Sequence, residues 1–196
     1  MKAEIDRLRE ATARVEFLIQ AVLVPGEQTS EGQLIQAVAI PWFAIVRRIL
    51  SEPSTIFEVD WRKWEELIAA AYKQEGWEVI LTPRSNDRGR DIIASSRERG
   101  TIRIVDQIKA YRPGRVVTAE EVRAMVGVMT LEQNVSKAFI TTTSTFAPGV
   151  FRDPDIARLM PYRLELRPKD ALVAWLGDLA RCHDARSSLP ERSIEQ

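Results

Sequence analysis

The sequence predicts an α/β domain, in which helices flank a mixed sheet and a helical extension precedes it. Apolar residues recur at helical spacing in the first third of the chain, and the pattern changes to short β-type runs from Trp77. A strand, a helix and a strand then follow in order over residues 102–142, as in a parallel crossover. Hydrophobic residues make up 45% of the 196 residues, which is enough for a buried core.

Residues 1–55 are predicted to form the helical extension. Its first helix, residues 3–24, carries a heptad seam of Ile5, Leu8, Thr12, Val15, Ile19 and Val22. The seam is short for a coiled coil, so packing against its own domain and pairing in a homodimer both stay open. Ser30 and Gln33 resemble a capping box that opens a second helix running to about residue 50, which Pro41 should kink or divide.

Residues 56–182 are predicted to form the core domain, and residues 183–196 a disordered tail. Asp60 is a suitable N-cap for a helix that ends at Gly76, and Thr118 with Glu121 forms a capping box for a later helix. Strands are predicted at 77–81, 91–94, 102–111, 138–142 and 162–166, with further helices after residue 148 and over 170–181.

Composition excludes several classes of function. Cys182 and His183 are the only residues of their types, which rules out a disulfide framework, a cysteine zinc site and a multi-histidine metal cluster. The apolar stretch 34–46 is too short to span a bilayer, and no secretory signal is visible, so we expect a cytoplasmic protein without membrane contact. The formal net charge is zero, so a nucleic-acid partner would need a local basic patch.

A group of polar residues in the predicted strands is the candidate catalytic site. Alternation places Gln107 and Lys109 on one face of their strand, and Asp91 reaches the same side if its strand pairs with theirs as a hairpin. An acid, an amide oxygen and an ammonium group then converge, which suits phosphodiester hydrolysis with Mg²⁺ or Mn²⁺. On spacing alone, the alternative is a solvent-facing strand with Asp91 closing a turn.

The region from Trp64 to Phe146 resembles the catalytic domain of the Mrr-like restriction endonucleases, members of the PD-(D/E)xK nuclease superfamily. The matching residues, in chain order, are Trp64-Glu65, Gly76-Trp77, Asp87-Arg88-Gly89-Arg90-Asp91, Gln107-Ile108-Lys109, the helix from Thr118, Thr141-Thr142 and Phe146. The resemblance implies a restriction-endonuclease-like fold and a Mg²⁺-dependent DNA endonuclease that acts in restriction or defence against foreign DNA.

The resemblance also implies roles for individual residues. Asp91 is the metal-binding acid, Gln107 the second ligand and Lys109 the catalytic lysine. Glu65 is an accessory acid from the helix, with Glu66 as the competing candidate, since one helical residue is a rotation of about 100°. Many superfamily members have Glu where this chain has Gln107, and an amide brings no charge to the metal.

Two further interpretations concern charge. Asp106 falls on the apolar face of its strand, so we interpret it as a structural carboxylate paired with an arginine or a helix-terminal amide. Residues 83–115 contain nine basic and four acidic side chains, and we expect Arg84, Arg88 and Arg112 to contact DNA phosphates. Thr141 and Thr142 could bond a phosphate oxygen, or could serve only as strand formers.

The sequence therefore predicts a metal-dependent DNA endonuclease. The alternative is a nucleic-acid-binding module that keeps the fold with little or no cleavage, and Gln107 is the residue that favours it. A third hypothesis is an interaction protein whose N-terminal helices dock a partner, but Asp91 and Lys109 together argue against it.

Overall fold

A computed structural model describes residues 2–83, 89–96, 98, 102–132 and 134–187. The helices are α1 (Lys2–Leu18), α2 (Pro41–Ser51), α3 (Trp61–Gln74), α4 (Ala119–Leu131), α5 (Pro154–Ala157) and α6 (Lys169–Ser187), with short 3-10 turns η1 (Pro53–Phe57) and η2 (Val150–Arg152). The strands are β1 (Leu23–Gln28), β2 (Gln33–Val38), β3 (Glu78–Leu81), β4 (Ile92–Ser96), β5 (Ile102–Lys109), β6 (Lys137–Thr142) and β7 (Leu164–Arg167).

The seven strands form one mixed sheet in the order β1-β2-β3-β4-β5-β6-β7. Neighbours from β1 to β5 are antiparallel, whereas β5, β6 and β7 run parallel to one another. Helix α4 makes the crossover from β5 to β6, as the strand-helix-strand order predicted. The capping box of Thr118 and Glu121 and the N-cap Asp60 are both present. The predicted mixed sheet flanked by helices is confirmed.

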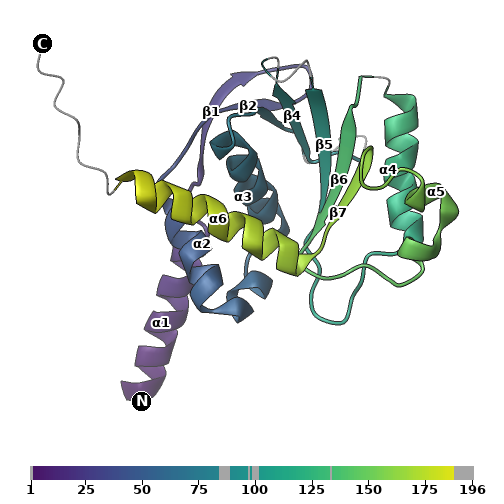
Figure 1. Cartoon of the computed structure of the whole chain (residues 1–196). Coiled ribbons are helices and arrows are strands. Elements are labelled where there is room, and N and C mark those ends of the chain that lie inside the picture. Colours follow the sequence, from purple (N-terminus) through teal and green to yellow (C-terminus); the bar gives the residue numbers. More distant parts are fainter. Residues whose placement is uncertain (1, 84–88, 97, 99–101, 133, 188–196) are drawn as a thin grey trace, which may run out of the picture.

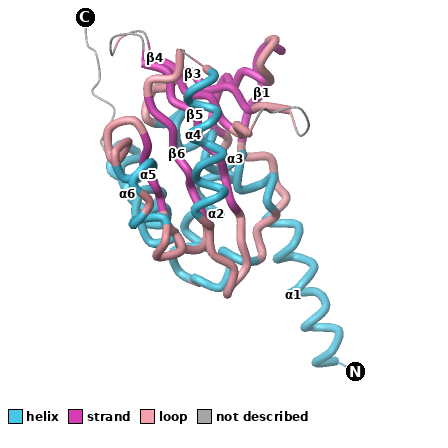
Figure 2. The backbone as a smooth tube through the Cα atoms, turned by 90° about the vertical axis from the view of Figure 1, so that its right-hand side faces the viewer, coloured by secondary structure: helices cyan, strands magenta, loops and turns pink. Residues whose placement is uncertain are grey.

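Helices cover both faces of the sheet (Figures 1 and 2), and each face has its own hydrophobic cluster. One cluster joins α2, α3 and α6 to Ile92 and Ile104, and the other joins α4 and α5 to Ile93 and Val105. This division follows from strand alternation, because successive residues of β4 and β5 point to opposite faces. Of the helices in the described ranges, none is long and apolar enough to cross a membrane.

The prediction of a purely helical extension over residues 1–55 was wrong. The first helix ends at Leu18, and β1 and β2 extend the sheet where helix was expected. The Thr29 hydroxyl accepts hydrogen bonds from the N–H groups of Glu31 and Gly32, and these bonds close a turn at the position of the expected capping box. A Cβ on Gly32 would lie 2.3 Å from the carbonyl oxygen of Leu81, so this turn packs directly on the end of β3.

Pro41 begins α2 instead of dividing a longer helix, which suits a residue without an N–H. At the other end of the chain, the expected disorder from residue 183 is wrong for residues 183–187, which belong to α6. There His183 stacks on Phe43 at 3.7 Å between ring centres, and Asp184 pairs with Arg47. Residues 188–196 of the predicted tail lie outside the described residues.

Candidate active site

The hairpin of β4 and β5 brings Asp91 beside Gln107. Ile92 pairs with Asp106, so Asp91 lies at the end of β4 nearest Gln107. The backbone N–H of Asp91 donates to the carbonyl of Asp106 at 3.0 Å, and its Oδ2 accepts from the N–H of Ile108 at 2.6 Å. These bonds hold the carboxylate against β5, as the predicted hairpin required.

Gln107 and Lys109 follow Val105 on the face of β5 that α4 covers. Gly89 lies beside them at φ +77°, and a Cβ there would be 3.8 Å from Nε2 of Gln107 and 3.3 Å from the side chain of Val128 on α4. A glycine is therefore the residue that suits this turn. The structure thus brings together three of the four predicted catalytic residues on one side of the sheet.

Glu65 and Glu66 point in different directions from α3. Glu65 is buried, at 4% exposure, and pairs with Arg62, whose Nη1 also donates to the carbonyl of Thr82 at 3.2 Å. The backbone N–H of Thr82 in turn donates to the Asp91 carbonyl at 3.0 Å, so Glu65 lies towards the Asp91 end of the sheet. Glu66 instead pairs with Lys63 and lines a surface pocket beside β1 and β2. The geometry therefore favours Glu65 as the accessory acid.

The two threonines at the end of β6 are fully buried and form hydrogen bonds within the fold. The Thr141 hydroxyl donates to Oδ2 of Asp106 at 2.8 Å, and the Thr142 hydroxyl donates to the carbonyl of Lys109 at 2.7 Å. Thr142 therefore supports the strand position that carries Lys109. The interpretation as strand residues is the one that these contacts favour over phosphate binding.

Asp106 is the structural carboxylate that its position predicted, and its partner is an arginine. Its Oδ2 accepts from the Tyr72 hydroxyl at 3.0 Å and lies 3.5 Å from Nη1 of Arg167. The Arg167 guanidinium also stacks on Trp175, 3.9 Å from the ring centre. Burial raises the pKa of Asp106, while the charge of Arg167 opposes that rise. The opposite face of β5 thus anchors the strand that presents Gln107 and Lys109.

A second polar group adjoins Lys109 and was missed by the sequence reasoning. The hydroxyl of Tyr111 donates to Glu121 in the first turn of α4, and Arg115 stacks on the Tyr111 ring at 3.8 Å. Burial and this hydrogen bond raise the pKa of Tyr111 to about 12. Partial burial works against ionisation of Glu121, but the bonds from Tyr111 and Thr118, with attraction to Lys109, lower its pKa.

The basic segment is less available to DNA than its composition suggested. Arg90 is buried and Arg103 is largely covered, and both form ion pairs with Glu31 of the β1–β2 turn. Arg112 is exposed, as the predicted phosphate contact required. Arg84 and Arg88, the other two predicted DNA contacts, lie outside the described residues. Local charge counting could not reveal these pairs, because Glu31 is remote in sequence.

Asp91 and Gln107 offer the oxygen donors that a divalent cation would need. Among the described residues, no group of three or more His, Cys, Asp or Glu side chains gathers as a metal site. Mg²⁺ is usually held by only one or two carboxylates, with water and substrate phosphate completing its shell. A carboxylate that uses one oxygen for Ile108 keeps further lone pairs for a metal, so the residues present fit such an ion.

A mixed sheet with helices on both faces, carrying Asp91, Gln107 and Lys109 at adjoining strand ends, is a restriction-endonuclease-like fold. The model of the restriction endonuclease family Mrr_cat matches residues 56–176, and the chain belongs to this family.

The uncharacterized protein y4cE of Sinorhizobium fredii (strain NBRC 101917 / NGR234) is 24% identical over 196 residues. That match takes in 100% of this chain and 46% of y4cE, so the chain spans about half the length of that relative.

Two solved structures are similar at lower identity. The restriction endonuclease MspJI, in complex with a 27-mer oligonucleotide, is 16% identical with a TM-score of 0.43, over 74% of this chain and 34% of that one. The DNA modification-dependent restriction endonuclease AspBHI is 15% identical with a TM-score of 0.44, over 87% of this chain and 44% of that one.

Proposed function

We propose that this chain is the catalytic part of a DNA endonuclease that hydrolyses phosphodiester bonds with a divalent cation, Mg²⁺ or Mn²⁺. The observation that carries the proposal is the placement of Asp91 against β5, on the same face as Gln107 and Lys109, in a chain of the restriction endonuclease family. Restriction or defence against foreign DNA is the cellular role that the family suggests.

The residues divide the work by their chemistry. Asp91 and Gln107 would hold the cation, which when bound adds positive charge next to the scissile phosphate and activates water. Lys109 orients the attacking water and neutralises charge that develops in the transition state. Glu65, held by Arg62 on α3, would serve as the accessory acid. Exposed Arg112, with Arg84 and Arg88, would bind the DNA backbone without reading sequence.

Cleavage of supercoiled plasmid in Mg²⁺ or Mn²⁺ tests the proposal. We expect nicking by the wild type, and its loss in both Asp91→Ala and Lys109→Ala with the circular dichroism spectrum unchanged. Lys137→Ala is the matched control, because Lys137 begins β6, the strand next to β5, and pairs with Glu165 away from the site. Equal nicking by all four proteins would show that these residues are not the active site.

The amide at position 107 supports a second candidate, a DNA-binding module with little or no cleavage. In that case the wild type would retain DNA in Ca²⁺ without nicking it in Mg²⁺ or Mn²⁺. Gln107→Glu would separate the two candidates further, because a restored carboxylate gives a non-cleaving module the charge that many superfamily members have at this position.

We also propose that the protein forms a homodimer through residues 3–24. Helix α1 projects away from the body of the molecule (Figures 1 and 2), and Ile5 within it is 44% exposed. Ile19, which follows the helix, is 68% exposed, whereas Val22 of the seam is buried against its own domain. Two copies would supply the two active sites that a double-strand cut needs. Light scattering should give twice the chain mass, and Ile5→Glu should halve it; a monomer mass for the wild type would refute the dimer.

A further inference from the structure

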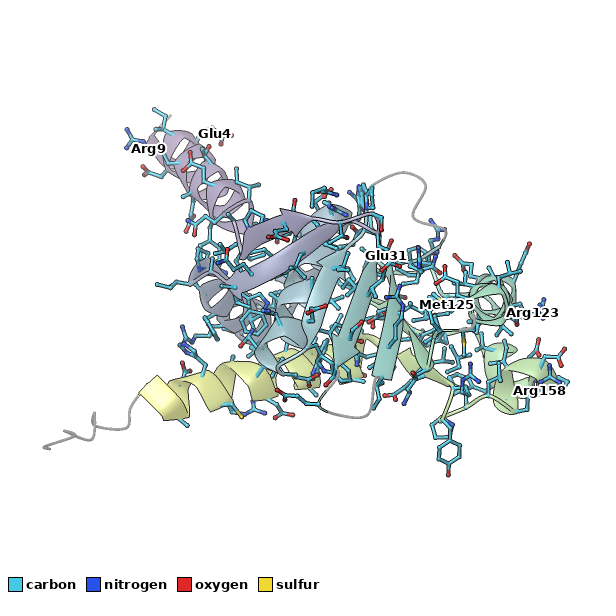
Figure 3. The ribbon with its side chains drawn as sticks, turned by 90° about the horizontal axis from the view of Figure 1, so that it is seen from above. Glu4, Arg9, Glu31, Arg123, Met125 and Arg158 are labelled. Carbon is cyan, nitrogen blue, oxygen red and sulfur yellow. The ribbon has the colours of Figure 1, made fainter. Side chains whose placement is uncertain are left out.

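Four charged side chains from separate parts of the chain meet around the guanidinium of Arg90, the residue before Asp91, on the side of the sheet that carries α4. They are Glu31 in the β1–β2 turn, Arg90 immediately before Asp91, Arg103 on β5 and Glu132 at the end of α4, and we call them the charge cluster. Figure 3 shows Glu31 towards the side of the molecule where Met125 of α4 lies. The cluster therefore joins the N-terminal hairpin to the elements that build the site.

The two arginines of the charge cluster are largely removed from water. Their side chains are 9% and 15% exposed, for Arg90 and Arg103 respectively. Nη1 of Arg90 lies 2.7 Å from Glu132 and 3.7 Å from Glu31, and Arg103 binds both carboxylate oxygens of Glu31. Two positive and two negative charges thus balance, with the arginines largely covered and Glu31 itself 35% exposed. An arginine that lost its partner in such a covered position would be costly.

The charge cluster reaches Asp91 through Arg90. The carbonyl of Arg90 accepts from the Thr82 hydroxyl at 2.6 Å. The guanidinium of the same residue is hydrogen-bonded to Glu132 at 2.7 Å and lies 3.7 Å from Glu31, which Arg103 holds in place. Both the backbone carbonyl and the side chain of Arg90 are therefore held in place. Asp91 is itself bonded to β5 through its backbone N–H and Oδ2. Arg90 is covalently joined to Asp91, so a shift of Arg90 would act on these bonds and on the carboxylate that they hold.

We propose that Glu31, acting through Arg90, is a positioning residue for the Asp91 carboxylate. The inference rests on the proposed function, since it concerns how Asp91 is presented to the cation. Glu31 lies outside the family match over residues 56–176, yet its contacts are with residues inside it. The catalytic unit of this chain therefore begins at β1, and the β1–β2 hairpin is part of it.

A cluster that served only stability would have a different signature. Loss of Glu31 would then lower the unfolding temperature, while the molecules that remain folded would bind metal as the wild type does. A positioning role requires weaker metal binding in the folded protein itself. Partners that orient a metal ligand typically change metal affinity or activity by about 10–100-fold when they are removed.

The test compares Glu31→Gln with the wild type, as full-length protein. Electron paramagnetic resonance measures Mn²⁺ binding without DNA, plasmid nicking gives the Mg²⁺ concentration at half-maximal rate, and thermal unfolding reports the folded fraction. We expect the dissociation constant for Mn²⁺ to rise about tenfold or more, with a matching rise in the Mg²⁺ requirement. Glu165→Gln is the control, because it removes the same charge from an ion pair elsewhere on the sheet.

The outcomes separate the two proposals. If the wild type binds Mn²⁺ and nicks DNA while Glu31→Gln binds Mn²⁺ equally well, the positioning role is wrong and the nuclease proposal stands. If Glu165→Gln weakens Mn²⁺ binding as much as Glu31→Gln, the effect is one of net charge and the positioning role is again wrong. A wild type that neither binds Mn²⁺ nor nicks DNA overturns both. If Glu31→Gln does not fold, the same measurements on Glu31→Asp test the positioning role, because aspartate keeps the charge on a shorter side chain.

Discussion

Replacing Arg167 by methionine tests whether the buried pair behind β5 holds the strand in place. Asp106 is fully buried and the Arg167 side chain is 11% exposed, so the substitution leaves a carboxylate without its cation in a covered site. At 3.5 Å and an effective dielectric constant of about 20, the attraction between the two charges is about 5 kcal/mol. Breaking a buried ion pair by removing one partner typically lowers the free energy of unfolding by about 3–5 kcal/mol, and we expect a loss of that size for Arg167→Met.

The loss should depend on pH in a defined direction. Burial already raises the pKa of Asp106, and without the opposing charge of Arg167 the pKa rises further. A carboxyl whose pKa is raised by folding contributes stability below its ordinary pKa, and that contribution is lost as pH rises through the folded-state pKa. Arg167→Met should therefore lose more stability relative to the wild type at about pH 8 than at about pH 5.

Urea unfolding followed by tryptophan fluorescence measures both effects, since the chain has five tryptophans. In the double variant Asp106→Asn with Arg167→Met, neither charge remains, and the new amide would still offer an oxygen to Tyr72 and Thr141. We expect the double variant to be more stable than Arg167→Met by about 1–3 kcal/mol of unfolding free energy. We also expect its stability relative to the wild type to be the same at about pH 5 and about pH 8. A loss below about 1 kcal/mol for Arg167→Met, or an equal loss at both pH values, would refute the reasoning.

Three further predictions concern the site. Gln107→Glu should lower the Mg²⁺ concentration needed for half-maximal nicking, because it adds a negative charge beside Asp91; an unchanged metal requirement would make Gln107 a bystander. Arg112→Ala should reduce the slope of log DNA affinity against log salt by about one, measured in Ca²⁺, and an unchanged slope would remove Arg112 from the interface. Tyr111→Phe should cost about 1 kcal/mol near neutral pH, where Glu121 is ionised. Tyr111 helps to lower the pKa of Glu121, so this loss of unfolding free energy should be present above the ordinary pKa of 4.5 and should fade as pH drops through the lowered pKa. Urea unfolding at several pH values measures it, and a loss that stays constant with pH would contradict the prediction.

The placement of the candidate site residues was predictable because it depends on short-range rules. Strand alternation alone put Gln107 and Lys109 on one face and Asp106 on the other, and the β4–β5 hairpin joins neighbouring segments of the chain. The same rule led to a buried partner for Asp106, although not to the identity of Arg167, which lies on a strand two places away in the sheet.

The N-terminal strands were not predictable in this way. Pro25 and Gly26 in β1 are poor strand formers, and the apolar residues after Leu34 fit a helix as well as a strand. Pairing of β2 with β3, which is a tertiary contact, decides between the two. The pairing of Arg90 with Glu31 is likewise a tertiary contact. Charge counting along the chain therefore included Arg90 in the basic segment over residues 83–115 without revealing its acidic partner.

The two outermost strands also determine how the sheet meets other copies of itself. In β1, Pro25 has no N–H to donate, and the pairing register with β2 shifts on both sides of it. The opposite edge, β7, has only four residues, and Glu165 on it pairs with Lys137. Short, irregular or charged edges are poor templates for intermolecular β-pairing, so neither border favours the strand addition that leads to aggregation. Copies of this protein that accumulate at high concentration would therefore associate through surfaces other than the ends of the sheet.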